Sequence, residues 1–334
     1  MNAMPSRTGV TPDIFLDQIL PARRPMVLKG VVSDWPARRL GAQSDEALVD
    51  YLKSCDEGRP VQAMVGAAEI RGAFFYGRDT SSFNYQTGNA PLSLVLDRIL
   101  EQRSRAQPES VYLQSTPIRE HFPKFLLQHA LPLLPPSVEP RIWIGNATVV
   151  QTHHDLKENI ACVVAGKRRF TLFPPEQLGN LYLGPLDRTP AGVPISMVSL
   201  DAPDLQRYPR FAEALAVAQV ADLEAGDAIY IPYGWWHHVR ATTPFNVLVN
   251  YWWSGGGAAL APPEFSLLMA LLALRDLPEH QLRMWKSMFD YYVFRSHGDP
   301  LQHLRPQDRG IAGASPAELQ ELARQMMASY LAAK

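Results

Sequence analysis

Two short motifs carry side chains that can bind a metal ion. One spans residues 151–155 and contains His153, His154 and Asp155, and the other spans residues 231–239. Neighbouring side chains on a strand point to opposite faces, so His153 and Asp155 share a face while His154 points away. Two histidines and one carboxylate that leave coordination positions open suit Fe(II) and oxygen chemistry. We therefore expect an iron site whose third ligand comes from the second motif.

The second motif offers two histidines, and strand alternation distinguishes them. His237 shares a face with Val239, whereas His238 shares the other face with Arg240. An arginine resists burial without a partner and a valine favours it, so His237 is expected to face the interior. His154 and His238 are then expected to support the site or to be structural.

The motifs lie in a region of short apolar runs punctuated by Gly, Pro and Asp. This pattern predicts a mainly β protein with a double-stranded β-helix, or jelly-roll, core and flanking helices. The runs read as strands are 142–144, 147–152, 160–165, 169–173, 195–199, 228–231, 236–241 and 246–252. The insertion 176–222 is long enough to be expected to cover a functional site.

The rest of the chain suggests three parts. Residues 1–140 read as an α+β part that packs on the core, with strands expected at 61–68 and 70–75, and the core occupies residues 141–256. Residues 257–334 read as helices, the last of them ending at Ala333, and they carry more apolar side chains than a peripheral hairpin needs. We expect this helical region to form a homodimer.

The bulk properties exclude several classes of function. Lys+Arg 32 and Asp+Glu 33 give 32 − 33 = −1 with no long run of one sign, so neither nucleic-acid nor membrane binding is indicated. Only two cysteines occur, without a Cys-x-x-Cys pair, which fits a reducing compartment. Without an apolar leader or a membrane-length run, a cytoplasmic protein is expected.

The motifs together resemble a known family. Residues 152–155, Asn159, residues 166–175 and residues 231–237 are similar to the cupin-like Jumonji-C family of Fe(II)/2-oxoglutarate-dependent oxygenases. Residues 24–28, 34–36 and 111–114 extend the resemblance over nearly the whole chain. The nearest subgroup is that of the asparaginyl hydroxylase that inhibits hypoxia-inducible factor, together with bacterial cupin-like proteins.

The resemblance implies roles for individual residues. His153, Asp155 and His237 would bind Fe(II), and Arg168 would hold the far carboxylate of 2-oxoglutarate where the asparaginyl hydroxylase has lysine. An arginine can serve because its planar fork matches a carboxylate, although its greater length would shift the depth of the pocket. The other residues expected near the co-substrate are Tyr112, Asn159, Asn250, Thr152 and Trp252. Val150 replaces the threonine of that relative, and Lys167 is expected to face outward.

The activity implied is oxidative decarboxylation of 2-oxoglutarate to succinate, coupled through O2 to hydroxylation of a protein side chain or a small molecule, with demethylation as a variant. A different class is a cupin that binds metal and ligand without turnover and serves as a sensor or interaction module. A third, a metal-dependent isomerase or dioxygenase that does not use 2-oxoglutarate, is disfavoured by Arg168 and Tyr112. Selectivity is expected to reside in loops 76–90 and 176–222, and residues 77–90 are expected to form a lid.

Overall fold

The computed structural model describes residues 1–255 and 262–332, with side chains to residue 330. The chain divides into two compact units, Met1–Gly255 and Gly256–Lys334. The predicted boundary between residues 256 and 257, and the predicted end of the last helix at Ala333, lie outside the described residues.

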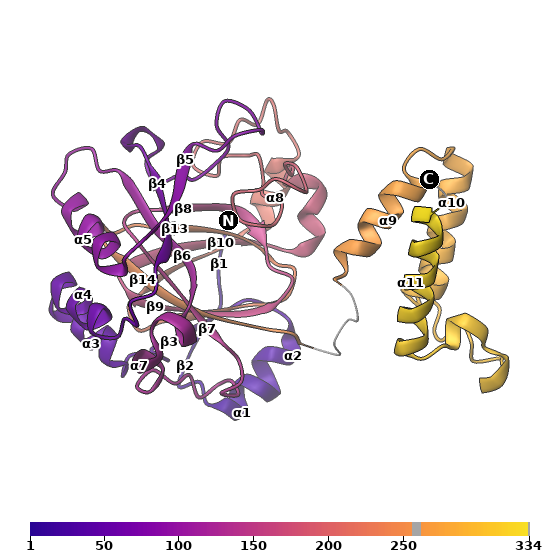
Figure 1. The fold of residues 1–334 in the computed structure, drawn as a ribbon, viewed down its shortest axis with the longest axis horizontal. Coiled ribbons are helices and arrows are strands. Elements are labelled where there is room, and N and C mark those ends of the chain that lie inside the picture. The colour runs from indigo at the N-terminus through magenta and orange to yellow at the C-terminus, as the bar shows by residue number, and fades with distance from the viewer. Residues whose placement is uncertain (256–261, 333–334) are drawn as a thin grey trace. The chain divides into compact units, whose positions relative to one another are not determined.

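Two β-sheets form the centre of the first unit (Figure 1). The five-stranded sheet has the order β1 (Asn2–Ala3), β11 (Gln219–Glu224), β10 (Lys167–Phe173), β13 (Trp236–Ala241) and β8 (Val149–His154). The nine-stranded sheet has the order β2 (Ser6–Thr8), β3 (Met26–Lys29), β12 (Ala228–Ile231), β9 (Glu158–Ala165), β14 (Asn246–Trp253), β7 (Pro140–Gly145), β6 (Ser110–Pro117), β4 (Val61–Gly66) and β5 (Tyr85–Ala90). Most pairs of neighbouring strands are antiparallel. The predicted jelly-roll core with flanking helices is confirmed.

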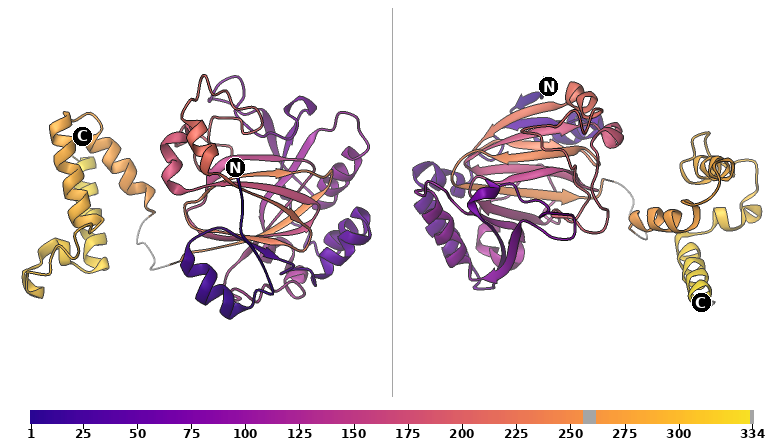
Figure 2. Two further views of the ribbon diagram at one scale, coloured as in Figure 1. Left: turned by 180° about the vertical axis from the view of Figure 1, so that it is seen from behind. Right: turned by 90° about the horizontal axis from the view of Figure 1, so that it is seen from above.

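Strand β9 shows how the sheets are held together. Every residue of this strand is buried, because both of its faces are covered. Ala161 and Val163 point into the space between the sheets, where they join Phe170 and Leu172 of β10 in one apolar cluster. The alternate residues, Ile160, Cys162 and Val164, belong to a second cluster that includes side chains of the helices. The layered sheets are seen edge-on in Figure 2.

Short helices surround these sheets. The amphipathic helices α4 (Asp45–Ser54) and α5 (Leu92–Gln102) bury Leu48, Leu52, Leu96 and Ile99 in the second cluster. The helices of the first unit are α1 (Pro12–Ile14), η1 (Phe15–Ile19), α2 (Leu20–Ala22), α3 (Pro36–Gln43), α4 (Asp45–Ser54), η2 (Ala68–Ile70), α5 (Leu92–Gln102), α6 (Ile118–His121), α7 (Pro123–Leu126), η3 (Pro175–Asn180) and α8 (Phe211–Val217).

Some local predictions were wrong. Residues 70–75 do not form a strand, and residues 195–199 contribute only an isolated bridge between Ser196 and Leu183. Both segments are short and apolar because they cover the core, and neither belongs to a sheet. The predicted lid 77–90 contains an edge strand, β5, which pairs with β4. Strands β2 to β6, all from the first 140 residues, are continuous with the nine-stranded sheet of the core.

The insertion 176–222 is tied to the core by its own apolar cluster. Leu181, Val198 and Phe211 pack against Phe173 of β10 and Trp236 of β13. The backbone N–H of Ser196 also donates a 2.8 Å hydrogen bond to the carbonyl oxygen of Thr152 in β8. The insertion is therefore attached directly to the strand that carries the first metal-binding motif.

The second unit is helical in its described part. Its elements are α9 (Glu264–Leu274), α10 (Glu279–Met288), η4 (Phe289–Val293), η5 (Pro306–Asp308), η6 (Gly310–Gly313) and α11 (Pro316–Ala332). Many large apolar side chains of this unit are exposed, among them Phe265, Leu268 and Leu272 of α9 and Trp285 of α10. Within the described residues, no helix has the combination of length and apolar character needed to cross a membrane.

Candidate metal centre

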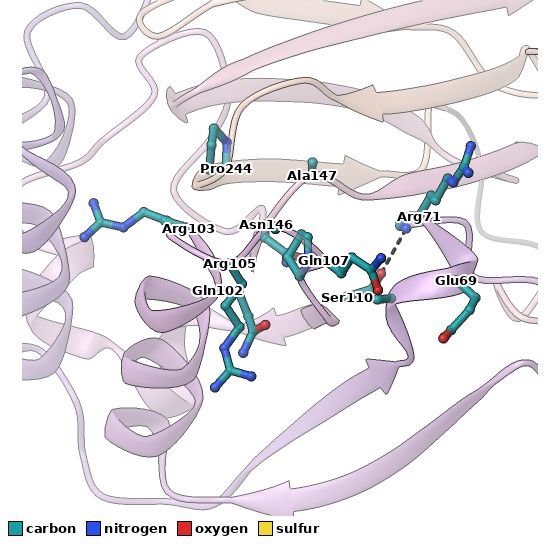
Figure 3. Close-up of a pocket in the computed structure, with 14 residues that line it drawn as sticks. Glu69, Arg71, Gln102, Arg103, Arg105, Gln107, Ser110, Asn146, Ala147 and Pro244 are labelled. Atoms are coloured by element: carbon teal, nitrogen blue, oxygen red, sulfur yellow. Dashed lines mark hydrogen bonds between the residues drawn. The ribbon is translucent and has the colours of Figure 1, made fainter.

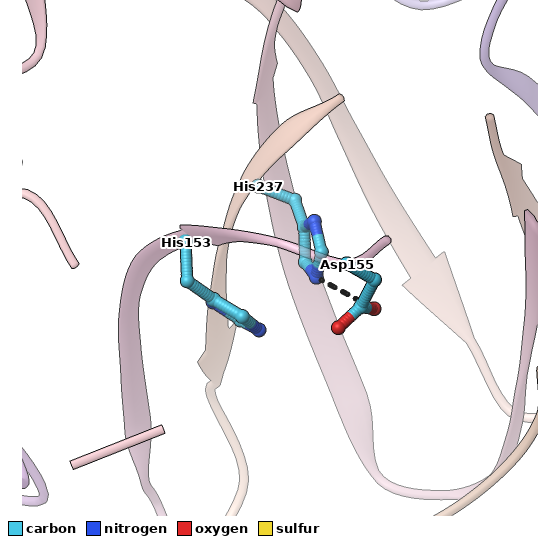
Figure 4. Close-up of side chains that lie close together, drawn as sticks. All are labelled: His153, Asp155 and His237. Atoms are coloured by element: carbon cyan, nitrogen blue, oxygen red, sulfur yellow. Dashed lines mark ion pairs between the residues drawn. The ribbon is translucent and has the colours of Figure 1, made fainter. Parts of the chain in front are cut away.

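Two neighbouring strands bring the predicted metal ligands together. His153 on β8 and His237 on β13 are directly opposite each other in the antiparallel register, and Asp155 follows the end of β8. The ligand atoms of these three residues all lie within 4.8 Å of one another (Figure 4). Nε2 of His237 is 3.5 Å from Oδ2 of Asp155. The arrangement can hold one metal ion.

Backbone contacts orient both imidazole rings. Nδ1 of His153 lies 2.8 Å from the carbonyl oxygen of Gln151, and Nδ1 of His237 lies 3.1 Å from that of Trp235. A ring nitrogen that bonds to a carbonyl oxygen carries the proton, which leaves Nε2 with a lone pair for a metal. Desolvation, and next the neighbouring His237, lower the pKa of His153 to about 4, so its neutral form is favoured.

The carboxylate of Asp155 is held from the opposite sheet. Trp252 Nε1 donates to Oδ2 of Asp155 at 3.0 Å, and Asn159 Nδ2 donates to the same oxygen at 3.1 Å. The backbone N–H of Gly234 also donates to the Asp155 carbonyl oxygen at 3.0 Å, which fixes the turn before β13. Gly234 has a φ of +78°, a left-handed conformation that glycine adopts without steric cost.

A buried arginine lies in the same cavity. Arg168 on β10 is 3% exposed, and within the described part of the chain its Nε and Nη2 have no hydrogen-bond partner. Burial lowers the pKa of this guanidinium and raises that of the Tyr112 hydroxyl, which lines the same cavity. Because an arginine remains charged in proteins, its two unpaired nitrogens call for an anion. Lys167 faces outward, as expected, and pairs with Glu224 at 2.6 Å.

These side chains line one cavity between the two sheets. It contains about 420 Å³ of space not filled by protein atoms, part of it open to solvent. Its lining includes eight of the nine predicted site residues, namely His153, Asp155, His237, Arg168, Tyr112, Asn159, Asn250 and Trp252. Trp143 also lines it and was not predicted, and its Nε1 donates to Oδ1 of Asn250 at 2.7 Å. Its place on β7 beside Asn250 on β14 could only be known from the strand pairing.

Thr152 is the predicted site residue that the structure does not bring into the cavity lining. Thr152 precedes His153 directly, so strand alternation turns it to the opposite face. A β-bulge lies beside it, because His237 is opposite His153 and Val239 is opposite Val150, so β8 has one residue more than β13 between the two pairs, and this extra residue brings Val150 to the same face as His153. Val150 and His153 both line the cavity, while Thr152 is buried elsewhere. His238 is also buried outside the lining, and the ring of His154 lies 4.4 Å from that of Trp236.

A wider hollow, of about 1300 Å³ including open solvent, lies beside α5 and the end of β7 (Figure 3). Its three arginines do not converge on a common point, and Arg103 is already paired with Asp45 and Glu46. The hollow therefore lacks the set of converging polar groups that the metal cavity has.

Comparisons with known proteins agree with this geometry. Residues 12–257 match the model of the family described as cupin-like domain. tRNA wybutosine-synthesizing protein 5 of Mus musculus is 28% identical over 75% of this chain and 77% of its own length. The human bifunctional peptidase and (3S)-lysyl hydroxylase JMJD7 is 27% identical over 72% of this chain and 79% of its own length. Lysine-specific demethylase 8 of Xenopus tropicalis is 26% identical over 72% of this chain and 50% of its own length.

Proposed function

The chain belongs to the cupin-like domain family, and from that premise we propose that it is an Fe(II)- and 2-oxoglutarate-dependent oxygenase. Within that class we propose a hydroxylase of a protein side chain or a small molecule. The observation that carries the proposal is the presence, in one cavity, of a three-residue metal-ligand set and a buried arginine with unpaired nitrogens. The names of the relatives, which include a hydroxylase and demethylases, support the same class.

The metal would be held by Nε2 of His153, Nε2 of His237 and the carboxylate of Asp155. Three protein ligands leave positions for a chelating co-substrate and O2, as non-haem Fe(II) oxygenases require. The hydrogen bonds that Nδ1 of each histidine donates, and those that Asp155 accepts, fix these ligands before the metal arrives, which lowers the entropic cost of binding. When bound, Fe(II) and 2-oxoglutarate supply the oxidative decarboxylation that is coupled to substrate hydroxylation.

The residues around Arg168 would hold the co-substrate. Its guanidinium can bind a carboxylate through two parallel hydrogen bonds, and Tyr112 lies beside it to share that group. Both side chains are almost completely buried, so a carboxylate there would be shielded from water and bound more strongly. Val150 contributes an apolar wall where the asparaginyl hydroxylase has a threonine, so this protein would anchor the carboxylate mainly through Arg168.

Succinate formation tests the proposal. The protein is incubated with Fe(II), 2-oxoglutarate and ascorbate, and succinate is measured with and without added cell extract. We expect succinate from the parent protein and from His280→Ala, a surface control on α10, and none from His153→Ala or Asp155→Ala. Binding of Fe(II) and 2-oxoglutarate without any succinate would favour the alternative, a cupin that binds its ligands but does not turn over.

RNA is a second candidate substrate because one relative is named as a tRNA wybutosine-synthesizing protein. We favour a peptide or small molecule, since the formal charge of −1 offers no excess of basic residues for a polyanion. Incubation with total tRNA or with a peptide digest, followed by mass spectrometry for addition of one oxygen atom, separates the two. Oxygen incorporated only into nucleosides would reverse our preference.

We also propose that the protein is a homodimer through its C-terminal helices. The apolar residues of α9 occupy all sides of the helix, and Phe265, Leu267, Leu268 and Leu272 are each more than half exposed. Clusters of this kind on a protein surface mark interfaces. A second copy is the simplest partner because it supplies the same apolar surface in a symmetric contact.

A further inference from the structure

A buried carboxylate outside the metal cavity is bonded to the turn between β12 and β13. Glu158, the first residue of β9, is 1% exposed and does not line that cavity. Its Oε1 pairs with Arg23, and its Oε2 accepts a 2.7 Å hydrogen bond from the hydroxyl of Tyr230. The same oxygen accepts from the backbone N–H of Tyr233 at 3.4 Å. Tyr233 lies in the turn 232–235, which we name the ligand loop.

The ligand loop contacts two of the three proposed metal ligands. The backbone N–H of Gly234 donates to the carbonyl oxygen of Asp155 at 3.0 Å. The carbonyl oxygen of Trp235 accepts a hydrogen bond from Nδ1 of His237 at 3.1 Å. The position of Asp155 and the orientation of the His237 ring therefore depend on where this loop lies.

Glu158 also fixes the start of β9, from which a neighbouring side chain reaches the same metal ligand. Asn159, the next residue, donates from Nδ2 to Oδ2 of Asp155 at 3.1 Å. Tyr230 joins Glu158 to the adjacent strand, because it lies opposite Ile160 in the pairing of β12 with β9. Two routes thus lead from Glu158 to Asp155, one through the ligand loop and one through Asn159.

The Glu158 carboxylate needs the Arg23 cation because it is removed from water. The side chain of Glu158 is 1% exposed, whereas that of Arg23 is 53% exposed. Backbone encloses the carboxylate on another side, since a Cβ on Gly255 would lie 2.8 Å from Oε1 of Glu158. A buried carboxylate that loses its cation is left uncompensated, and the groups around it must shift. The ion pair thereby fixes the position at which Glu158 holds the ligand loop.

We infer that Glu158 is a positioning residue for the proposed metal centre. Paired with Arg23, it holds the ligand loop in the place where Asp155 and His237 can share one metal ion. The inference rests on the proposed function, since it takes the three-residue ligand set as the metal site. It adds to that site a charged residue that does not line the cavity.

Titration of the full chain with Co(II) tests the role of Glu158. In Glu158→Gln one carboxylate oxygen becomes an NH2 group, which places a donor against the donors that surround it. We expect the Kd for Co(II) to rise by about tenfold, at the low end of the effect of residues that orient metal ligands. The visible absorption bands of bound Co(II), which report its coordination geometry, should change as well. A folded variant with the parent's Kd and spectrum would overturn the inference.

Arg23 provides a second test in case Glu158→Gln does not fold. Arg23→Met removes the cation and is expected to weaken Co(II) binding in the same way. Arg23→Lys keeps the charge and should retain most of the parent's affinity. If Arg23→Met bound Co(II) as tightly as the parent does, the ion pair would have no part in positioning the ligands.

Asp227 is the matched control for a general loss of stability. Its carboxylate, directly before β12, has a side chain that is 12% exposed and pairs with Lys29 at 2.7 Å. It also accepts from the backbone N–H of Gly30 at 3.1 Å. Asp227→Asn should unfold at a lower temperature than the parent but keep the parent's Kd and spectrum for Co(II). Equally weakened Co(II) binding in Asp227→Asn would show that the effect is not specific to Glu158, and the inference would fall.

A succinate assay on the same preparations separates the inference from the proposed function. If the parent binds Co(II) but forms no succinate with Fe(II) and 2-oxoglutarate, the oxygenase proposal falls and the role of Glu158 in metal binding stands. If the parent forms succinate but Glu158→Gln and Arg23→Met bind Co(II) as it does, the inference falls and the oxygenase proposal stands. A parent protein that binds no Co(II) would overturn both.

Discussion

The indole nitrogen of Trp252 donates a 3.0 Å hydrogen bond to Oδ2 of Asp155, from a strand of the opposite sheet. The contact links the two layers of the core at the proposed metal centre. It also means that the orientation of one proposed metal ligand depends on a side chain nearly a hundred residues away.

The substitution Trp252→Phe tests this relationship. It keeps an aromatic ring in the cavity and removes the donor to Asp155, so the metal affinity should fall by about 10- to 100-fold, as for other residues that orient metal ligands. Titration with Fe(II) or Co(II) measures the effect. The same change at the neighbouring Trp253, which packs on Phe15 and Tyr230, should leave the affinity nearly unchanged. Equal losses in both variants would contradict a specific role for Trp252.

The substitution Arg168→Met should weaken the binding of 2-oxoglutarate without lowering the stability of the protein. Losing a charged hydrogen-bond partner should raise the Kd for 2-oxoglutarate by roughly 10- to 100-fold. Because the variant also removes a buried charge with unpaired nitrogens, the protein without ligand should be at least as resistant to unfolding as the parent. Calorimetric titration and thermal unfolding provide the two measurements. Arg169→Met is the control, since Arg169 is exposed and pairs with Asp222; unchanged 2-oxoglutarate binding in Arg168→Met would refute the assignment.

Protonation of the buried His129 is expected to destabilise the folded protein in acid. Its Nε2 accepts from the backbone N–H of Ala37 at 2.9 Å, and burial lowers its pKa to about 4. The folded state therefore binds this proton less readily than the unfolded state does. The free energy of unfolding should fall as the pH is lowered from about 6.5 towards 4, by up to roughly 3 kcal/mol from this residue.

Urea unfolding of the metal-free protein between pH 4 and pH 7 measures this dependence. Tryptophan fluorescence is a suitable probe because one of the seven tryptophans, Trp35, has its ring 5.3 Å from that of His129. His129→Gln does not titrate and should show a shallower dependence on pH than the parent. The slope that remains would come from His153 and His238, whose pKa values are lowered in the same direction. If the unfolding free energy of His129→Gln changed with pH as steeply as that of the parent, His129 would not contribute to the loss of stability in acid.

Self-association can be tested by placing two charges on α9. Light scattering coupled to size exclusion should give a dimer for the parent and a monomer for the double variant Leu268→Glu, Leu272→Glu, because each carboxylate would have to be buried in the apolar contact. Leu94→Glu places the same change on an exposed position of α5 and should remain dimeric. A monomeric parent at micromolar concentration would reject the proposal.

The outline of the site could be predicted from local pattern. Strand alternation correctly placed His153 with Asp155, and His237 with Val239, on the faces that line the cavity. The turn at Gly166, with a φ of +77°, followed by β10 with Arg168 inward and Lys167 outward, could also be predicted. These features depend on the geometry of one strand and on the polarity of its own residues.

The placement of Val150 in the cavity wall and the structure of the segment 195–199 could not be predicted in this way. The bulge in β8 shifts alternation by one residue, and it exists because β8 must match β13 on both sides of it. Ser196 is bridged to Leu183 within the insertion, and its backbone N–H donates to the carbonyl oxygen of Thr152 in β8. The segment 195–199 therefore has a strand-like sequence without belonging to either sheet.

The amino-acid sequence by itself determined which side chains could bind metal and diacid, and which face of its strand each one occupies, because alternation and polarity act over a few residues. The tertiary structure decided the rest. Only strand pairing sets His153 opposite His237 and brings Trp252 and Asn159 to Asp155. It also buries Arg168 in a place where no described residue bonds to its Nε and Nη2. The physical reason is that these contacts join segments from different sheets, whose register is set by packing of the whole core.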